Sequence, residues 1–579
     1  MSSFEIKKYD FNSSAVDRLN GHYENNWPVV YQIRNNCEIY IGETTNLKSR
    51  MKQHLESEEK NSLQDGVFNV VLDKTFNKSV ALDLESYLIQ YFGGDGRFKV
   101  LNRNDGMRDR DYYNRAKYRE TFEEIWNRLR ELKIADQSIT EIKNSALFKF
   151  SPYKNLNLEQ LDVVTKILLN IDEAIANNRK SLSIIGGDAG TGKTIVIMFL
   201  AKLLADLQNF NGDKEDIDDE SSFGEFFTNK TLNNRFKNKR IALVVPQTSL
   251  RGRIESILDK SGLGDANIQI FSPISFGKQD GEFDITLIDE AHLLKVGGYG
   301  AMGKVLKTVK SINEKMFGDN EPHSELDWIM EKSKNVVMVY SKAQRIRPGN
   351  ITREDDIDKY MIPFAGMEYY LRDQMRSEGG VGYIKYIDSV FSNSFHPAQK
   401  ETFKNFDVKI FKDFRKFKQA IDKKEQEVGL SRLVAGFAWE WKSHGKGQRD
   451  AYDIEIDGIK LRWNSTLVNF LGSEKSKQEV GSIYTVQGDD LNYAGVIIGN
   501  DLIRRKGRLM FNKQSYADVG AMKRNRRQVE KNEALSEDDL LNQVLRIYRV
   551  LLSRAIKGTY IYVCDDELRK YLSKYFDVV

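Results

Sequence analysis

The stretch LSIIGGDAGTGKTIVIMFLA, residues 182–201, decides the fold of most of this chain. An apolar segment of strand length enters a glycine-rich turn, and an apolar segment of helix length follows it. The turn, GDAGTGKT at residues 187–194, satisfies the spacing G-x-x-x-x-G-K-[ST]. Such glycines let backbone N–H groups surround phosphate oxygens, and the N-terminus of the next helix adds a partial positive charge. We therefore predict that this turn binds the phosphates of a nucleotide.

The residue types of the turn predict how ATP and its magnesium ion are held. Lys193 would reach the β- and γ-phosphates, and Thr194 would ligate Mg²⁺. The turn itself would meet the phosphates at Gly187, Gly190 and Gly192. A chance match is the alternative, but strand, turn and helix follow one another in the order that the site requires.

Composition limits the class of protein. The chain has 579 residues, of which 40% are hydrophobic and 30% charged, as in an ordinary globular protein of several domains. Cys37 and Cys564 lie far apart, which argues against a disulfide scaffold and fits a reducing compartment. No signal peptide opens the chain, and Lys202 and Asp206 interrupt its most apolar helix, so we expect a cytoplasmic protein without a membrane partner. A net charge of +4 is too small to indicate a polyanion partner.

An acidic pair supplies the second strong signal for nucleotide hydrolysis. The run DITLIDEAH at residues 284–292 reads as an apolar strand followed by Asp289 and Glu290. Open α/β sheets hold their ligands at the carboxyl ends of their strands. Asp289 would hold Mg²⁺ through water, and Glu290 would orient and deprotonate the water that attacks the γ-phosphate. A purely structural pair is the alternative, and the phosphate loop upstream disfavours it.

The N-terminal region predicts a hairpin. Residues 27–33 and 38–42 read as strands. If Asn35 and Asn36 form a two-residue turn, Arg34 pairs with Cys37 and Tyr31 faces Tyr40 across the ladder. Two tyrosines on one face are either aromatic packing or part of a site.

Two helices add candidate polar residues to this region. Asn46 is a candidate cap for a helix that places Arg50 and His54 on one face. A second helix over residues 81–92 places Glu85 on an apolar stripe. A carboxylate there is either a partly exposed edge residue or a metal ligand at a cleft.

Together these residues resemble the GIY-YIG nuclease domain. The resemblance covers about residues 27–105 and rests on six positions in order: VVY at 29–31, YIG at 40–42, Arg50, His54, Glu85 and Asn102. The first motif departs from the family by its valines, although the tyrosine is kept. The resemblance implies that Glu85 holds one divalent metal, Mg²⁺ or Mn²⁺, and that Arg50 stabilises the developing charge. It also implies that Tyr31 helps to activate water, with Tyr40 and His54 in support.

Further motifs resemble those of superfamily 1 helicases. Gln160 lies where the Q-motif has its adenine-binding glutamine, and a surface glutamine is the alternative. Residues 335–345 resemble motif III, in which Gln344 would sense the γ-phosphate, although Ser341 replaces the usual aspartate. Residues 371–376 resemble motif IV, whose Arg376 would reach across the cleft to the nucleotide. Residues 247–251 either contact a nucleic-acid backbone or begin a helix.

The last motifs resemble motifs V and VI. Gln487 lies in the motif V stretch, residues 481–490, and is a candidate contact to the nucleotide site. Residues 548–555, YRVLLSRA, resemble motif VI, whose Arg554 is the candidate arginine finger. Arg376 and Arg554 taken singly could be structural ion-pair partners, but their order after the phosphate loop and the acidic pair favours the site.

From about residue 156 onward the chain is similar to the Schlafen-type DNA/RNA helicases. The resemblances imply an α/β chain in which a small nuclease domain precedes two RecA-like P-loop lobes with parallel sheets. The expected divisions are residues 1–107 for the nuclease domain, 108–150 for a helical connector, 151–350 for the first lobe and 351–579 for the second. Trp439, Trp441 and Trp463 are expected in the core.

The resemblances imply an ATP-dependent helicase or translocase with an N-terminal metal-dependent endonuclease. Its expected partner is nucleic acid, DNA rather than RNA, and its expected setting is the bacterial cytoplasm, in defence against phage. One alternative is a repair or recombination helicase whose nuclease resolves branched DNA. Another is an ATP-dependent sensor whose N-terminal domain binds nucleic acid without cutting it. The sequence gives no indication of oligomeric state.

Overall fold

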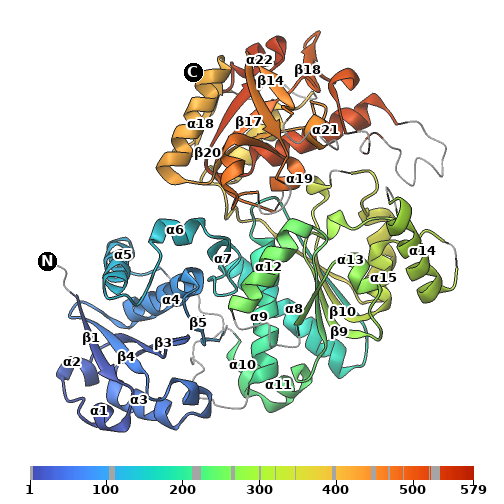
Figure 1. Ribbon diagram of the computed structural model, residues 1–579. Coiled ribbons are helices and arrows are strands. Elements are labelled where there is room, and N and C mark those ends of the chain that lie inside the picture. The colour runs from blue at the N-terminus through green and yellow to red at the C-terminus, as the bar shows by residue number, and fades with distance from the viewer. Residues whose placement is uncertain are drawn as a thin grey trace.

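Three sheets organise the computed structural model of the chain (Figure 1). The structure describes residues 4–103, 111–210, 223–261, 268–298, 301–319, 321–345, 347–393, 399–444, 451–466, 470–486, 488–518, 520, 522 and 535–579. The N-terminal domain lies beside the first lobe, and the second lobe lies above both in this view. Short helices of the connector, including α7 (Ala146–Lys149), lie between the N-terminal domain and the lobes.

The N-terminal sheet has five strands in the order β1-β4-β2-β3-β5. Their bounds are β1 (Phe4–Asp10), β2 (Val29–Arg34), β3 (Glu38–Thr44), β4 (Val67–Asp73) and β5 (Lys99–Val100). Helix α3 (Leu47–Glu56) shares a core with one face of the sheet, and α4 (Lys78–Asp95) shares a core with the other. Because helices cover both faces of the sheet, apolar side chains that point to either face are buried.

The hairpin between β2 and β3 has a different register from the one expected. Asn35, not Arg34, closes the turn: its backbone N–H donates to Glu38 O at 3.1 Å, and its side chain accepts from the N–H groups of Cys37 and Glu38. The two-residue turn is therefore 36–37. Tyr31 pairs with Gly42 rather than with Tyr40, so our expectation for this pairing was wrong. The shift is by an even number of positions, so both tyrosines keep the same face of the sheet.

The connector consists of α5 (Arg115–Glu131), α6 (Ile139–Asn144) and α7. The apolar stripe of α5, as its spacing predicts, is buried in the core beneath α4, and Phe122, Ile125, Trp126 and Leu129 form it. The connector is thus packed against the N-terminal domain along its length.

The first lobe is a six-stranded, fully parallel sheet. Its strands, in spatial order, are β11 (Met367–Leu371), β6 (Ser181–Gly187), β10 (Ser333–Val339), β9 (Phe283–Ile288), β7 (Ile241–Val244) and β8 (Ile268–Phe271). Because β11 pairs with β6 at one edge, the first lobe continues past residue 350, where we had expected it to end. The strand is short and mostly exposed, so its hydrophobic pattern is weak.

Helices cover both faces of this sheet. One core contains α8 (Leu158–Ala176), α9 (Lys193–Asn209), α10 (Gly224–Thr228), α11 (Lys230–Phe236) and α12 (Thr248–Lys260). On the other side lie α13 (Pro273–Gly277), α14 (Gly303–Phe317) and α15 (Glu325–Glu331). This arrangement keeps all of the central strands buried and leaves their carboxyl ends for polar residues.

The second lobe has eight strands, parallel except for the β14–β15 pair. In spatial order they are β14 (Ile454–Ile456), β15 (Ile459–Trp463), β16 (Glu479–Ser482), β13 (Ser431–Ala435), β17 (Leu491–Ile498), β20 (Ala555–Val563), β12 (Asp407–Phe411) and β21 (Asp577–Val578). Its helices include α17 (Gly380–Val390), α18 (Phe414–Val428), α21 (Glu537–Leu552) and α22 (Asp566–Leu572).

The predicted fold class, α/β with parallel sheets in two lobes after a small domain, is confirmed. Trp463 is buried in the core of the second lobe, as expected, and Trp439 and Trp441 pack against that core. Among the helices of the described residues, none has the length and apolarity needed to cross a lipid bilayer.

Candidate nucleotide cleft and nuclease site

The phosphate loop joins β6 to α9 and depends on its glycines. Gly187, Gly190 and Gly192 have φ values of 148°, 90° and 81°, in the region that favours glycine. A Cβ atom at Gly190 would come within 2.0 Å of the amide oxygen of Gln374. The segment that leads into the second lobe lies on this loop: Met375 N donates to Gly190 O at 2.8 Å, and the Gln374 amide donates to Ala189 O at 2.8 Å. Only a residue without a side chain fits beneath that segment.

Lys193 is buried at the first position of α9. Its ammonium group donates to Gly187 O at 2.9 Å and to Asp188 O at 2.6 Å. Burial lowers the pKa of Lys193 to about 8, against the attraction of Glu290. The loop thus holds a cation at the N-terminus of a helix, where anions bind.

The acidic pair follows β9 and meets the phosphate loop. Thr194 Oγ1 donates to Asp289 Oδ1 at 3.3 Å, so the two residues expected to hold Mg²⁺ are in contact. Asp289 is fully buried, and its Oδ2 atom has no hydrogen-bond partner. Burial, followed by the nearby charge of Glu290, raises the pKa of Asp289 to about 7. An oxygen pair with one free carboxylate atom suits a hard cation.

Glu290 has a φ of 52°, a strained value for a residue with a side chain. His292, also buried, lies with Nε2 at 3.0 Å from Glu290 Oε2. Burial lowers the pKa of His292 to about 4, so the imidazole is neutral at pH 7 and contacts the carboxylate without a positive charge. Sequence reasoning gave His292 no role, although it completes the DEAH run.

A cavity of about 310 Å³ lies between the two lobes at this point. Its lining includes the phosphate loop, Glu290, Gln344 and Arg376, together with Gly488 and Asp490 of the second lobe. Arg376 forms an ion pair with Asp490. The cavity therefore lies between the lobes, where the sequence predicted the nucleotide.

Arg554 lies directly behind the second-lobe wall of this cavity. Its Nη1 donates to Asp489 O at 3.3 Å, whereas Nε and Nη2 are buried without partners. Burial, with repulsion from Arg376, lowers the pKa of Arg554 to about 9. A buried guanidinium with unused donors is suited to an anion that enters the cleft.

The glutamines of the predicted site have different surroundings. Gln160 accepts from Asn157 N at 3.1 Å and donates to Thr191 O at 3.2 Å, so it caps α8 and supports the phosphate loop. Its contact with adenine stays a prediction. Gln344 is buried at the cavity with its amide oxygen unpaired. Gln487 lies outside the described residues.

Unpaired polar atoms around the cleft fit a nucleotide and its metal. Asp289 Oδ2, Gln344 Oε1, Arg376 Nη1 and two nitrogens of Arg554 are buried without partners. Leaving such groups unpaired costs about 1–3 kcal/mol each. Phosphate oxygens would accept from the arginine nitrogens, and a cation or a bound water would pair with the two oxygens. The donor set therefore suits a triphosphate with a divalent cation.

The predicted nuclease residues of β2, β3 and α3 are in contact. Tyr31 Oη lies 2.7 Å from His54 Nε2 and 3.4 Å from Arg50 Nε, and the rings of Tyr31 and Tyr40 are 6.4 Å apart. A Cβ at Gly42 would lie 2.3 Å from Tyr31 Oη, which explains the glycine of the YIG motif. As predicted, Asn46 caps α3 and so sets the position of Arg50 and His54.

Glu85 lies on α4, half-buried beside the apolar stripe that packs on the other face of the sheet. Asn102 holds the backbone of β3, because its amide both accepts from Ile41 N at 3.1 Å and donates to Ile41 O at 2.7 Å. Among the described residues there is no group of three or more His, Cys, Asp or Glu side chains that could hold a metal. Glu85 lies on α4, which packs on the other face of the sheet from α3, so its role as a metal ligand stays a prediction.

Sequence reasoning missed several cations near the two sites. Lys60 is buried with its ammonium 4.0 Å from the centre of the Tyr40 ring. Lys149 of α7 and Lys154, between α7 and α8, line the nucleotide cleft. Lys60 lies in a polar segment and the other two lie in the aromatic segment FKFSPYK at 148–154, and neither segment carries a motif that marks the lysines.

The stretch 247–251 begins a helix, the simpler of its two alternatives. Gln247 is the N-terminal cap residue of α12, and Arg251 donates to Val245 O at 3.0 Å, within its own strand and helix. Gln247 also reaches the second lobe, where its amide donates to Tyr484 O at 3.4 Å. The segment therefore joins the lobes.

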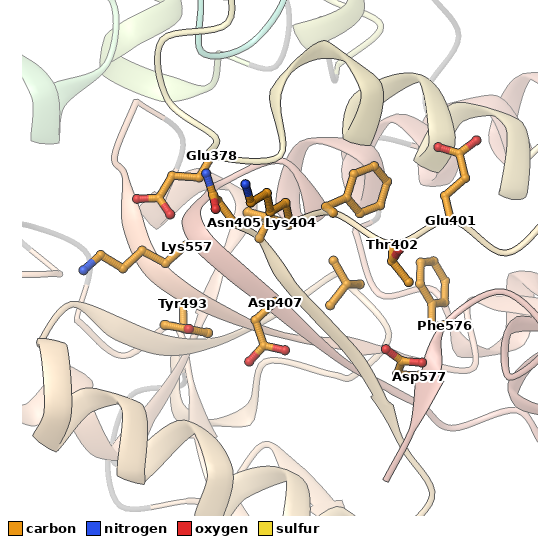
Figure 2. Close-up of a pocket in the computed structure, with 13 residues that line it drawn as sticks. Glu378, Glu401, Thr402, Lys404, Asn405, Asp407, Tyr493, Lys557, Phe576 and Asp577 are labelled. Carbon is orange, nitrogen blue, oxygen red and sulfur yellow. The ribbon is translucent and has the colours of Figure 1, made fainter.

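A second hollow, of about 490 Å³, lies on the second lobe beside β12 (Figure 2). Its charged lining consists of Glu378, Glu401, Asp407, Asp577, Lys404 and Lys557. Carboxylates outnumber lysines, so this surface repels a phosphate backbone. We assign no nucleic-acid contact to it.

Comparisons with known proteins match the N-terminal domain and the two lobes. The family model described as Schlafen group 3, DNA/RNA helicase domain, matches residues 180–565, and the model described as GIY-YIG catalytic domain matches residues 28–96. An uncharacterized protein of Saccharomyces cerevisiae (strain ATCC 204508 / S288c), YPL245W, is 27% identical over 425 residues, which are 68% of this chain and 84% of that protein. The crystal structure of Bacteroides Pif1 bound to ssDNA aligns with 68% of this chain and with 92% of its own chain, at 9% identity and a TM-score of 0.22. This TM-score is too low to establish a common fold.

Proposed function

The chain belongs to the Schlafen group 3 DNA/RNA helicase family, and from this premise we propose that ATP hydrolysis between its lobes drives movement along a nucleic-acid strand that its GIY-YIG domain cuts. The enzyme joins a helicase, which is an ATPase, to an endonuclease. Its expected division into a nuclease domain, a connector and two lobes is part of the proposal, with the end of the first lobe moved to Leu371.

One observation carries the proposal: a single cavity joins the phosphate loop and Glu290 of the first lobe to Arg376 and Asp490 at the second. In it, Lys193 would hold the terminal phosphates, and Thr194 and Asp289 would hold Mg²⁺, which supplies charge neutralisation when bound. Glu290, oriented by His292, would accept a proton from the attacking water. Arg376 and Arg554 would stabilise the charge that develops on the phosphoryl group.

In the N-terminal domain the proposal gives Tyr31 the role of activating water, because its hydroxyl is hydrogen-bonded to His54. Arg50, which donates to the same hydroxyl, would stabilise the charge on the scissile phosphate. Tyr40 packs against His54 in support, with ring centres 5.1 Å apart. Glu85 would hold Mg²⁺ or Mn²⁺, which polarises the phosphodiester when bound.

The first prediction concerns the phosphate loop. Lys193→Ala removes the cation that the loop carbonyls hold, so we expect ATP turnover to fall by about 10²–10³-fold or more. The measurement is steady-state ATPase activity in the presence of DNA, with circular dichroism to verify the fold. Lys166→Ala, at an exposed position on α8, is the matched control and should leave turnover unchanged. Normal hydrolysis by Lys193→Ala would refute the assigned role.

The second prediction separates the two activities. Glu85→Gln keeps the shape of the side chain but removes the charge that holds a cation, so cutting should stop while ATPase activity persists. Cleavage of labelled DNA and RNA with Mg²⁺ or Mn²⁺ measures the nuclease activity, and phosphate release measures the ATPase activity. Glu124→Gln, at an exposed position of α5, is the control. Metal-dependent cutting by Glu85→Gln would place the catalytic carboxylate elsewhere.

We propose DNA as the main substrate and defence against phage in a bacterial cytoplasm as the setting, because a motor and a nuclease in one chain suit the destruction of invading DNA. Similar chains also occur in yeast, as the relative shows. Unchanged plaque counts across a broad phage panel, with and without the gene, would count against this setting. Preferential cleavage of forked or four-way DNA over linear DNA would instead favour repair.

A further inference from the structure

The connector helices, together with residues 150–157 that join them to α8, form part of the nucleotide cleft, and this whole stretch is called the connector below. Besides the lobes, the cavity of about 310 Å³ is lined by Lys143, Phe148, Lys149, Phe150 and Lys154. All five precede α8 and lie before residue 180, where the match to the helicase domain begins. Three lysines of this stretch therefore border the cleft.

Lys149 is bonded to the second-lobe wall, and Lys154 lines the same cavity. Lys149 Nζ donates to Asp490 O at 2.9 Å, and Asp490 is the carboxylate that pairs with Arg376. Burial lowers the pKa of Lys149 to about 8, and burial likewise lowers the pKa of Lys154 to about 8. Both ammonium groups have therefore lost water that an anion in the cleft would replace.

The charge of the cleft favours an anion. Among the described residues that line it, five are cationic and two are anionic: Lys143, Lys149, Lys154, Lys193 and Arg376 against Glu290 and Asp490. Arg376 is paired with Asp490, and Glu290 attracts the ammonium group of Lys193. The remaining positive charge comes from Lys143, Lys149 and Lys154.

The connector is bonded to the second lobe and to the nuclease domain, and these bonds fix the backbone that carries its lysines. On the second lobe, Asn144 donates to Val428 O at 3.1 Å and accepts from Asn492 at 2.9 Å. On the nuclease side, Ser86 of α4 donates to Asn155 at 2.8 Å. A rigid support on two sides lowers the entropic cost of binding a ligand with these side chains.

We propose that Lys149 and Lys154 are nucleotide-binding residues that the connector supplies to the phosphates of ATP. The inference rests on the proposed function of the cleft and adds a third contributor to it beside the two lobes. When ATP binds, the ammonium groups pair with phosphate oxygens by charge-assisted hydrogen bonds. The nucleotide then joins the lobes to the segment that supports the nuclease domain.

The test uses the full chain with both lysines changed, Lys149→Gln and Lys154→Gln. The Kd of a fluorescent ATP analogue should rise by about tenfold or more, which corresponds to about 1.4 kcal/mol. The Kd of the matching AMP analogue should change much less, because the lysines bind the terminal phosphates. The control is Lys117→Gln, an exposed lysine on α5, which should bind both analogues as the unchanged protein does.

A charge-keeping variant distinguishes binding from folding. Lys149→Arg with Lys154→Arg should retain ATP binding within about threefold at pH 7. Lysines of pKa about 8 lose their charge as the pH rises through 8, whereas arginines do not. Lys193, whose pKa is also about 8, remains in both proteins, so both should lose affinity between pH 7 and 9, and the arginine variant should lose less. An equal loss in the two proteins would overturn the inference, and this comparison holds even if the glutamine variant misfolds.

Each outcome has one meaning. If the unchanged protein binds no ATP, the proposed function fails and the inference falls with it. If the unchanged protein binds ATP, equal Kd values for the folded glutamine variant would overturn the inference and leave the proposed function intact. Equal losses for the ATP and AMP analogues would also overturn it, because they would indicate a general change in the cleft. A loss specific to ATP, prevented by arginine, supports it.

Discussion

At the scale of single residues, burial sets the chemistry of the cleft. Lys193, Asp289, His292 and Arg554 all have pKa values displaced toward their neutral forms, with desolvation as the largest cause in each. A bound triphosphate would stabilise the charged forms of the two cations, and a metal ion that of Asp289. The site is thus electrostatically incomplete without its ligand.

Asp501 in the second lobe offers a test of burial away from the cleft. It is buried and accepts from Tyr548 Oη at 2.6 Å, and burial raises its pKa to about 7. A carboxyl with a folded pKa above its unfolded pKa of 3.8 contributes stability below pH 4 that is lost as the pH rises through 7. Asp501→Asn, which cannot ionise, should therefore be about 2 kcal/mol more stable than the unchanged protein at pH 8.

The measurement is thermal unfolding of both proteins between pH 5 and pH 8. The advantage of Asp501→Asn should shrink toward pH 5, where the native carboxyl is protonated in the folded state. Tyr548→Phe, which removes the hydrogen bond and keeps the acid, is the companion variant and should become less stable at every pH. A Tm of Asp501→Asn below that of the unchanged protein at pH 8 would contradict the assigned burial effect.

Residue-level predictions from sequence succeeded where a motif fixes both spacing and backbone. The phosphate loop, the acidic pair and the Asn46 cap of α3 lie where their residue types require. The hairpin register could not be fixed in this way, because Asn35 and Asn36 both favour turns and only the bonds made by the Asn35 side chain select 36–37. The position of the lysines in the cleft could not be predicted for a different reason, because their burial depends on segments hundreds of residues away.

At the scale of elements, the contact between α4 and the connector depends on glycines near the end of α4. A Cβ at Gly94 would lie 2.7 Å from Ile142 and 2.8 Å from Phe148, and a Cβ at Gly93 would lie 3.0 Å from Tyr153. The helix surface is therefore flat where α6 and α7 pack on it. Because α4 also carries Glu85, the proposed nuclease carboxylate and the cleft lysines are attached to one packed unit.

Gly94→Leu tests this contact. The added side chain would displace Ile142 and Phe148, so stability should fall by about 1–3 kcal/mol. We also expect any change that ATP causes in the rate of DNA cutting to diminish, because the connector would no longer be held against α4. The measurements are Tm and the ratio of cleavage rates with and without ATP, and Ser79→Leu, at an exposed position of α4, is the control. An unchanged Tm and ratio would show that the contact is loose.

Element-level prediction was accurate for helices and central strands, whose apolar periodicity is strong. The strand expected before the phosphate loop is β6 (Ser181–Gly187), the helix expected after it is α9 (Lys193–Asn209), and the strand expected before Asp289 is β9 (Phe283–Ile288). Edge strands escaped prediction, because β1 and β11 alternate weakly and expose much of their surface. Their place in a sheet follows from pairing with a distant strand and not from their own pattern.

At the scale of the whole molecule, ion pairs hold the lobes together. Arg253 of α12 forms a bidentate ion pair with Asp489 of the second lobe, in which Nη2 donates to Oδ2 at 2.8 Å. Arg549 of α21 lies 3.7 Å from Asp188 in the phosphate loop. These pairs surround the cleft, so closure of the lobes and the electrostatics of the site depend on the same charges.

Arg253→Ala leaves Asp489 buried and without its guanidinium partner, so we expect a loss of about 3–5 kcal/mol and an opened cleft. Unfolding by urea measures the first effect, and the radius of gyration from X-ray scattering measures the second. The double variant Arg253→Met with Asp489→Leu removes both charges and should regain most of the stability. If Arg253→Ala is as stable as the unchanged protein, the pair does not hold the lobes.

The chain passes from the first lobe to the second over the phosphate loop itself, where Gln374 and Met375 are bonded to Ala189 and Gly190. Under the proposed function, a rotation of one lobe against the other would be centred near the nucleotide. Such a rotation displaces atoms in proportion to their distance from the axis, so a small change of angle at the phosphates would become a large displacement at the far ends of the lobes. A nucleic-acid strand bound far from the axis would then move farthest.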